Sequence, residues 1–124
     1  MSSKEKIEAQ KLYFGAGSSN LTIEAKKSLD LIITELNSNS DFRLEIKGHN
    51  DAKESELAPS QNMYKEIANK RINSVLIYLK SNGIDESRLI STSEGSMTPN
   101  SEVVESDDEE LKFAKNRRVN FKLR

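Results

Sequence analysis

The chain has 124 residues, of which 35% are hydrophobic and 31% are charged, a length that accommodates one domain with one modest core and excludes two. Its 19 basic and 20 acidic residues give a formal net charge of −1, so no global field attracts nucleic acid or an anionic membrane surface. No apolar run approaches the ~20 residues that cross a bilayer, and the first residues lack the apolar stretch of a secretory signal. We therefore expect a local site to read any ligand, and an export signal or lipid anchor to lie upstream of this sequence.

The cysteine and histidine content excludes several kinds of catalytic and metal-binding site. The absence of cysteine excludes disulfides, thiolate metal sites and a cysteine nucleophile. The single histidine, His49, would need further metal ligands that cannot be nominated, so we expect it to pack at a strand end and predict no metal site. The run Gly15-Ala16-Gly17-Ser18 could offer backbone N–H groups to a carboxylate. It lacks the lysine and spacing of a phosphate loop, and no cofactor is predicted.

The first part of the chain predicts a strand, a helix and a second strand. Residues 1–10 mix charges with few apolar side chains and are expected to form a flexible lead-in. Alternation at 12–14 predicts a short strand, and apolar spacings of three and four over 22–36 predict a helix with Thr22 as its N-cap. The clearest strand follows at 42–47, where apolar and charged residues alternate strictly.

The second part begins with polar residues 52–61, which we expect to be a mobile loop. A second helix is predicted from near Ser60–Tyr64 to Asn82-Gly83, with Arg71 in its N-terminal half. A third strand at 88–94, an acidic loop leading into a short helix, and a final strand at 119–123 complete the pattern.

This order, β-α-β-α-β-(α)-β, predicts one α+β domain over residues 11–124. Strands with one polar face cannot be covered on both sides, so we expect a two-layer sandwich with the helices packed on one face of a mixed four-stranded sheet. The alternating triplets of the second and last strands should share one buried face. These triplets are Phe42, Leu44 and Ile46, and Val119, Phe121 and Leu123.

Asp51 and Arg71 are the pair that could carry binding chemistry. Asp51 follows a predicted strand and Arg71 lies near the start of the next helix, so the two could flank one cleft. A carboxylate takes an ammonium group and a guanidinium takes a carboxylate bidentately, which makes such a pair a receptor for a zwitterion. On spacing alone, a turn-forming aspartate and a solvated helix arginine are the favoured interpretation.

The segment Gly48-His49-Asn50-Asp51 resembles the Gly-His-Thr-Asp signature of the OmpA-like C-terminal domain family, to which OmpA, the Pal lipoprotein and MotB belong. Other matching residues follow in the family's order over residues 12–124. They are Leu12-Tyr13-Phe14, Leu21, Arg71 with Val75, Tyr78-Leu79, Gly83-Ile84, Arg88-Leu89, Gly95 with Pro99, and Asn116-Arg117-Arg118-Val119.

The resemblance implies a non-enzymatic module that binds the diaminopimelate of the peptidoglycan stem peptide and anchors an envelope protein or complex to the cell wall. In that family the acid takes the ligand's ammonium group and the helix arginine takes its carboxylate, and Asp51 and Arg71 hold those positions. Asn62 is the candidate for a ligand-binding asparagine before the helix. Arg117 either donates at the pocket rim or neutralises the acidic 105–110 run.

Other implied features concern the surroundings of the site. His49 and Asn50 would support the site without contacting the ligand. The implied location is the periplasm, in a domain of an outer-membrane or lipid-anchored protein, with other envelope proteins as further partners.

The sequence departs from the family pattern at the signature. Asn50 replaces the usual Thr, Glu54 replaces the usual Gly, and the separation of Asp51 from Arg71 is longer. Glu54 adds negative charge beside a site that must admit a carboxylate. One alternative is therefore an OmpA-like protein interaction domain of an envelope secretion or motility complex that has lost wall binding. A glycan hydrolase is a third class, but no carboxylate pair is singled out for it.

Overall fold

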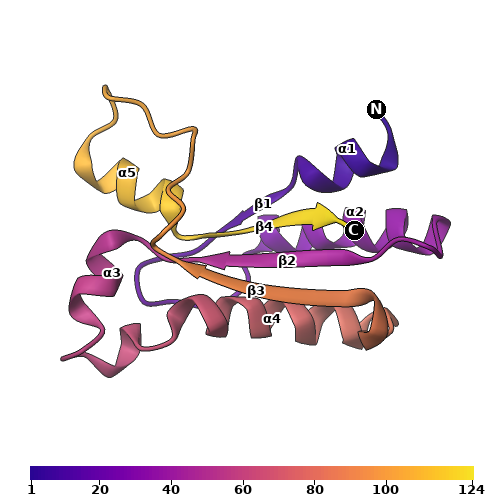
Figure 1. Ribbon diagram of the computed structural model, residues 1–124, viewed down its shortest axis with the longest axis horizontal. Coiled ribbons are helices and arrows are strands. Elements are labelled where there is room, and N and C mark those ends of the chain that lie inside the picture. Colours follow the sequence, from indigo (N-terminus) through magenta and orange to yellow (C-terminus); the bar gives the residue numbers. More distant parts are fainter.

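The computed structural model describes all 124 residues and contains one mixed four-stranded sheet (Figure 1). The strand order is β1-β4-β2-β3, in which β2 and β3 are parallel and the other neighbours are antiparallel. This confirms the predicted α+β class. None of the helices combines the length and apolar character of a membrane span. In chain order the elements are α1 (Ser3–Glu8), β1 (Lys11–Tyr13), α2 (Ile23–Ser38), β2 (Leu44–His49), α3 (Ala52–Leu57), the 3-10 turn η1 (Asn62–Tyr64), α4 (Ile67–Ser81), the 3-10 turn η2 (Glu86–Arg88), β3 (Leu89–Gly95), α5 (Glu109–Asn116) and β4 (Arg118–Leu123).

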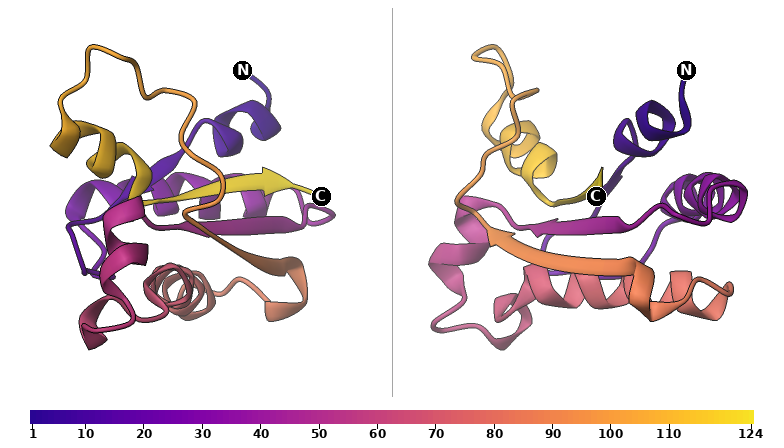
Figure 2. Two further views of the ribbon diagram at one scale, coloured as in Figure 1. Left: turned by 60° about the vertical axis from the view of Figure 1, so that its left-hand side comes forward. Right: turned by 45° about the vertical axis from the view of Figure 1, so that its right-hand side comes forward.

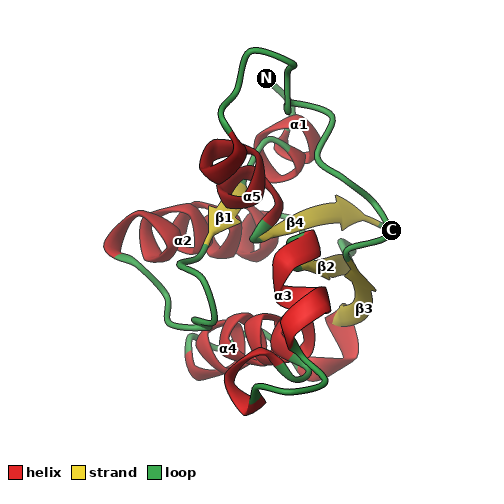
Figure 3. Ribbon diagram, turned by 90° about the vertical axis from the view of Figure 1, so that its left-hand side faces the viewer, coloured by secondary structure: helices red, strands yellow, loops and turns green.

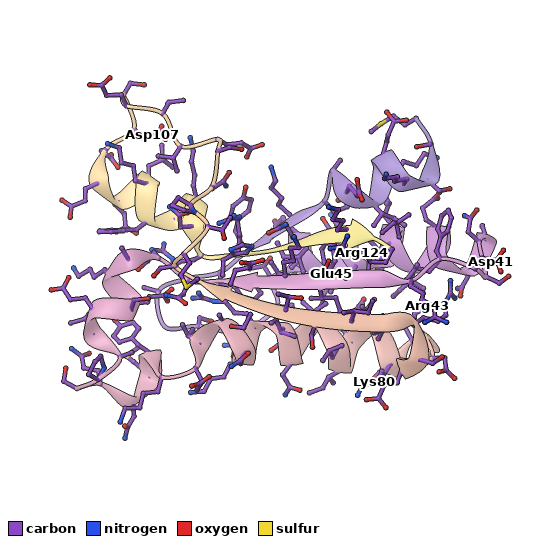
Figure 4. The ribbon with its side chains drawn as sticks, in the orientation of Figure 1. Asp41, Arg43, Glu45, Lys80, Asp107 and Arg124 are labelled. Carbon is purple, nitrogen blue, oxygen red and sulfur yellow. The ribbon has the colours of Figure 1, made fainter.

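Helices α2 and α4 lie side by side against one face of the sheet (Figures 1 and 2). Their apolar stripes meet the inward-facing strand residues in a single core. The opposite face carries charged side chains, such as Glu45 of β2, whose Oε1 accepts a hydrogen bond of 2.8 Å from Arg124 Nε beyond the end of β4 (Figure 4). The core includes Leu29, Ile32 and Leu36 from α2, Ile72, Val75 and Leu79 from α4, and Leu44, Ile46, Val119 and Phe121 from the strands.

The register of β2 against β4 confirms the shared buried face. Leu44 lies opposite Leu123, and Ile46 lies opposite Phe121. Leu44 and Ile46 are fully buried, and Phe42 packs against the same core from just before the strand. The period of two therefore predicted both the strands and the face that each presents to the helices.

Residues 1–10 were expected to be a flexible lead-in, but residues 3–8 form helix α1. Its N-terminus is closed by a capping box in which the Ser2 side chain accepts from Glu5 N–H and the Glu5 side chain accepts from Ser2 N–H. Ile7 is fully buried in the core, and Glu8 Oε2 accepts a hydrogen bond of 2.9 Å from Leu123 N–H of β4. The packed unit thus begins before residue 11.

The polar stretch 52–61, predicted to be a mobile loop, is largely helical. It forms α3, which stands at the end of the sheet (Figure 3), and the turn η1 follows it. The helix starts at a second capping box, in which the Asp51 side chain accepts from Glu54 N–H while the Glu54 side chain accepts from Asp51 N–H. As a result α4 begins at Ile67, later than predicted, and Arg71 lies in its second turn.

Gly48 sets the distance between α4 and β2. A Cβ atom at this position would lie 2.5 Å from Ile72 Cγ1 and 2.6 Å from the backbone oxygen of Ala68. No side chain fits there unless the helix moves away. The glycine therefore brings the first turns of α4 directly onto the end of β2, which is where the candidate site lies.

We expect Gly48→Ala to destabilise the fold by about 1–3 kcal/mol, because the added methyl group overpacks this contact. The measurement is the free energy of unfolding by chemical denaturation. Gly15→Ala is the matched control, because a Cβ atom there would meet only Ser18 Cβ at 3.9 Å. Equal stability of the two variants would contradict the role assigned to Gly48.

Candidate functional site

Arg71 lies at the centre of the site and is fully buried. All five of its N–H donors are used. Three go to backbone carbonyl oxygens, from Nε to Ser18 at 2.9 Å, from Nη1 to His49 at 3.1 Å and from Nη2 to Gly15 at 3.1 Å. The remaining two go to the Glu54 carboxylate, from Nη1 at 2.8 Å and from Nη2 at 2.7 Å.

The Glu54 carboxylate accepts two backbone hydrogen bonds in addition to this bidentate pair. Asp51 N–H donates to Oε1 at 3.1 Å, and Gly17 N–H donates to Oε2 at 2.8 Å. Arg71, Asp51 N–H and Gly17 N–H therefore form a receptor for one carboxylate with four donated hydrogen bonds, which we call the carboxylate cradle. It is occupied by Glu54, whose side chain is 2% exposed.

The net electrostatic effect of the cradle is to favour the ionised carboxylate. Burial of Glu54 raises its pKa, but the hydrogen bonds and charge of Arg71 and the two backbone N–H groups outweigh burial, and the net pKa is lowered. The stability that this group contributes is thus present above its ordinary pKa and is lost as pH falls through the lowered value.

Asp51 lies beside the cradle and is also buried. Its Oδ1 accepts from Glu54 N–H at 2.6 Å, and its Oδ2 accepts from Arg117 Nη1 at 3.1 Å. Arg117 reaches this position from the junction of α5 and β4 and also donates to the Phe14 carbonyl and to Glu110 Oε1. Arg117 thus pairs with one acid of the 105–110 run, as one of its two interpretations predicts, and it also holds Asp51.

The structure brings Asp51, Arg71 and Arg117 together but does not place them around an open cleft. No hydrogen bond joins Asp51 to Arg71 directly; Glu54 links them, and each already has partners within the chain. The cavity beside Asp51, Glu54 and Arg117 measures about 110 Å³, which is smaller than the ~300–1,000 Å³ of typical ligand pockets. The expected zwitterion receptor is therefore closed in this structure.

The other predicted residues have different surroundings. Asn50 is buried, and its Nδ2 donates to Asp51 O at 2.8 Å and to Ser55 Oγ at 2.7 Å, which fits a supporting role. Asn62 is exposed in η1, makes no side-chain hydrogen bond and lines neither neighbouring cavity. The structure does not bring Asn62 to the cluster.

His49 is buried on the sheet face opposite the helices, and neither ring nitrogen has a hydrogen-bond partner. Burial and the nearby positive charge of Arg118 lower its pKa to about 4. The ring is therefore neutral near pH 7, as expected of a packed histidine. No group of three or more histidine, aspartate or glutamate side chains has a metal-binding arrangement.

Glu54 is the functional group of the cradle that the sequence prediction missed, because it was recognised only as an unfavourable charge. The Gly17 N–H comes from the run 15–18, which was expected to offer backbone N–H groups to a carboxylate. The spacing of Asp51 and Glu54 is that of a capping box, a signal that predicts both the helix start and the inward orientation of Glu54. The Gly17 N–H has no sequence signal beyond its loop, where the positive φ of 66° of this residue favours glycine.

Comparisons with known proteins agree with this fold. The OmpA family model matches residues 13–117. The peptidoglycan-associated lipoprotein from Burkholderia pseudomallei is similar, with a TM-score of 0.75 and 21% identity over 96% of this chain and 93% of that one. A putative MotB-like protein from Desulfovibrio vulgaris has a TM-score of 0.70 and 27% identity over 90% of this chain and 69% of that one.

A third similar structure is the cell wall anchor of the T6SS from Pseudomonas aeruginosa, with a TM-score of 0.64 and 20% identity over 88% of this chain and 72% of that one. No match was found among the curated proteins. The mixed sheet and the two covering helices are those of an OmpA-like domain. The chain belongs to the OmpA family.

Because Arg71 is buried in an ion pair, its replacement should affect the fold as well as binding, which differs from the expectation of a solvated helix arginine. Arg71→Ala should lower the free energy of unfolding by about 3–5 kcal/mol, since it leaves the buried Glu54 carboxylate uncompensated. Chemical denaturation measures this loss. The double variant Arg71→Met/Glu54→Gln should recover part of the lost stability, because it removes both charges of this ion pair. An Arg71→Ala variant as stable as the wild type would contradict the assignment.

His49 should make stability depend on pH. The unfolded histidine binds a proton below about pH 6.5, whereas the folded one does so only near pH 4. The free energy of unfolding should therefore fall as pH decreases from 6.5 to 4, by about 3 kcal/mol in total. Thermal unfolding across this range should show the decrease in the wild type and a flatter profile in His49→Leu; parallel profiles would show that His49 titrates normally.

Proposed function

We propose that this chain is a non-catalytic module that binds peptidoglycan in the periplasm and anchors an envelope protein or complex to the cell wall. Membership of the OmpA family and the names of the similar proteins, which include a peptidoglycan-associated lipoprotein and a cell wall anchor, support the proposal. The parent protein would be held in or at the outer membrane by a segment other than this domain.

We further propose that the ligand group is the diaminopimelate zwitterion of the stem peptide. The ligand carboxylate would enter the carboxylate cradle at Arg71, and the ligand ammonium group would pair with Asp51. Arg117 would hold Asp51 in position through its hydrogen bond of 3.1 Å. The observation that carries this proposal is the cradle itself, because its four donated hydrogen bonds are arranged for a single carboxylate.

A second candidate function is a protein interaction domain that has lost wall binding. It is favoured by the fact that Glu54 already satisfies Arg71 in a buried pair. A hydrolytic function has less support, because the lowered pKa of Glu54 is the reverse of what a general acid at neutral pH requires.

Sedimentation with purified diaminopimelate-containing sacculi tests the proposed function. We expect the wild type to pellet and Asp51→Asn to bind roughly tenfold to hundredfold more weakly, because the ammonium group loses its charged partner. Asparagine caps a helix as well as aspartate does, so α3 should still form. Calorimetric titration with a stem peptide measures the same change.

Asp41→Asn is the matched control, because it removes one acid from the end of the molecule remote from α3 (Figure 4), where Asp41 is exposed and has no ion-pair partner. Equal pelleting of all three chains would place the site elsewhere. If neither the wild type nor a variant with Glu54 replaced pellets with the sacculi, the interaction-domain candidate is favoured.

A further inference from the structure

Glu54 closes both halves of the proposed zwitterion receptor at once. Its side chain fills the carboxylate cradle at Arg71, and its backbone N–H donates to Asp51 Oδ1 at 2.6 Å. A zwitterionic ligand needs these same two partners, one for its carboxylate and one for its ammonium group. A single residue of the chain therefore occupies the positions of both ligand charges.

We infer that Glu54 competes with the wall ligand for the carboxylate cradle. The ligand binds when the start of α3 opens and the ligand carboxylate replaces that of Glu54. This inference rests on the proposed function and adds a way in which binding of the wall ligand is regulated. The closed form is the one described here. In the open form the cradle takes a free carboxylate, and the acid of Asp51 is uncovered for an ammonium group.

The cradle has the attachments that such an exchange requires. Arg71 is fixed by three carbonyl oxygens, those of Gly15, Ser18 and His49, and none of them belongs to α3. Departure of Glu54 thus leaves the guanidinium in place, with two donors directed at the emptied position. The Gly17 N–H also lies outside α3 and stays with the cradle.

Helix α3 is held mainly by the carboxylate that would be exchanged. It has six residues, and Glu54 is the only buried one among them. Its other side-chain tethers are the hydrogen bonds of Ser55 to Asn50 at 2.7 Å and to Ser96 at 2.8 Å. Opening the helix therefore exposes little apolar surface, and a ligand carboxylate restores the largest polar contact that is lost.

The segment that carries α3 also ends at an unfavourable backbone conformation. Glu66, immediately before α4, has a φ of 55° and is the only non-glycine residue with a positive φ. Left-handed backbone disfavours residues with a Cβ atom. The closed form thus retains local strain at the end of the segment that would have to move.

Competition by Glu54 lowers the apparent affinity for the ligand by the fraction of molecules that are open. Removing the Glu54 carboxylate should raise this apparent affinity. We expect Glu54→Ala to bind a diaminopimelate-containing stem peptide at least about tenfold more tightly than the wild type in calorimetric titration, and sacculus sedimentation to follow the same order. Glu54→Gln should lie between them, because it keeps one acceptor for Arg71 and more of the stability while losing the charge.

Glu56→Ala is the matched control. Glu56 lies on the same helix, is exposed and has no ion-pair partner, so its removal changes the net charge equally without opening the cradle. Affinity that rises as much in Glu56→Ala as in Glu54→Ala would reduce the effect to general charge repulsion and overturn the inference. Equal affinity of the wild type and both Glu54 variants would also overturn it.

A stability measurement tests the cradle without any wall material. Sodium acetate, compared with sodium chloride at the same ionic strength, should raise the thermal unfolding midpoint of Glu54→Gln and Glu54→Ala by binding in the emptied cradle. The wild type and Glu56→Ala should show no such difference. An acetate effect of equal size in all four chains would contradict a cradle closed by Glu54.

The two measurements separate the inference from the proposed function. A cradle-specific acetate effect with no sacculus binding by any variant would retain Glu54 as the occupant of a carboxylate site and reject the wall as its ligand. Wall binding by the wild type that Glu54 replacement does not strengthen, with no acetate effect, would retain the proposed function and reject the competition.

Discussion

The rest of the site depends on the hydrogen bonds and the ion pair of the buried Arg71 guanidinium. A buried donor without an acceptor is destabilising, and the guanidinium carries five donors that each need an acceptor. To satisfy them, the loop after β1, the end of β2 and helix α3 converge on one side chain of α4, and the Phe14 ring lies 5.3 Å from the guanidinium carbon. The close approach at Gly48 makes this convergence possible. The close packing of α4 on β2 therefore also forms the site.

Two groups of ion pairs extend outward from this centre. Glu54 pairs with Arg71, and Asp51 pairs with Arg117, which in turn pairs with Glu110 of the exposed helix α5. The buried Asp51 is thus connected to the solvent-facing acidic segment through a single arginine.

The periodicities of the sequence predicted the sheet, both large helices and the buried faces of β2, β4 and these helices, because one-sided burial imposes periods of two and 3.6. They failed at α1 and α3, which have six residues each, too few for a periodicity to be visible. Both short helices instead begin with capping boxes, so local hydrogen-bond chemistry was the better signal. The predicted residues Asp51, Arg71 and Arg117 do lie in one cluster, but their spacing could not reveal that Glu54 satisfies Arg71 from within the chain.

Helix α1 has a consequence for how the molecule behaves among its copies. Strand β1 has three residues and pairs with only the first half of the six-residue β4, so the second half of that edge has no strand beside it. Helix α1 packs there, and Glu8 takes up the Leu123 N–H. A chain shortened to begin at Lys11 would leave the edge uncovered, with backbone donors and acceptors free to recruit a strand from another molecule. Helix α1 thus covers an edge of the sheet that β1 is too short to cover.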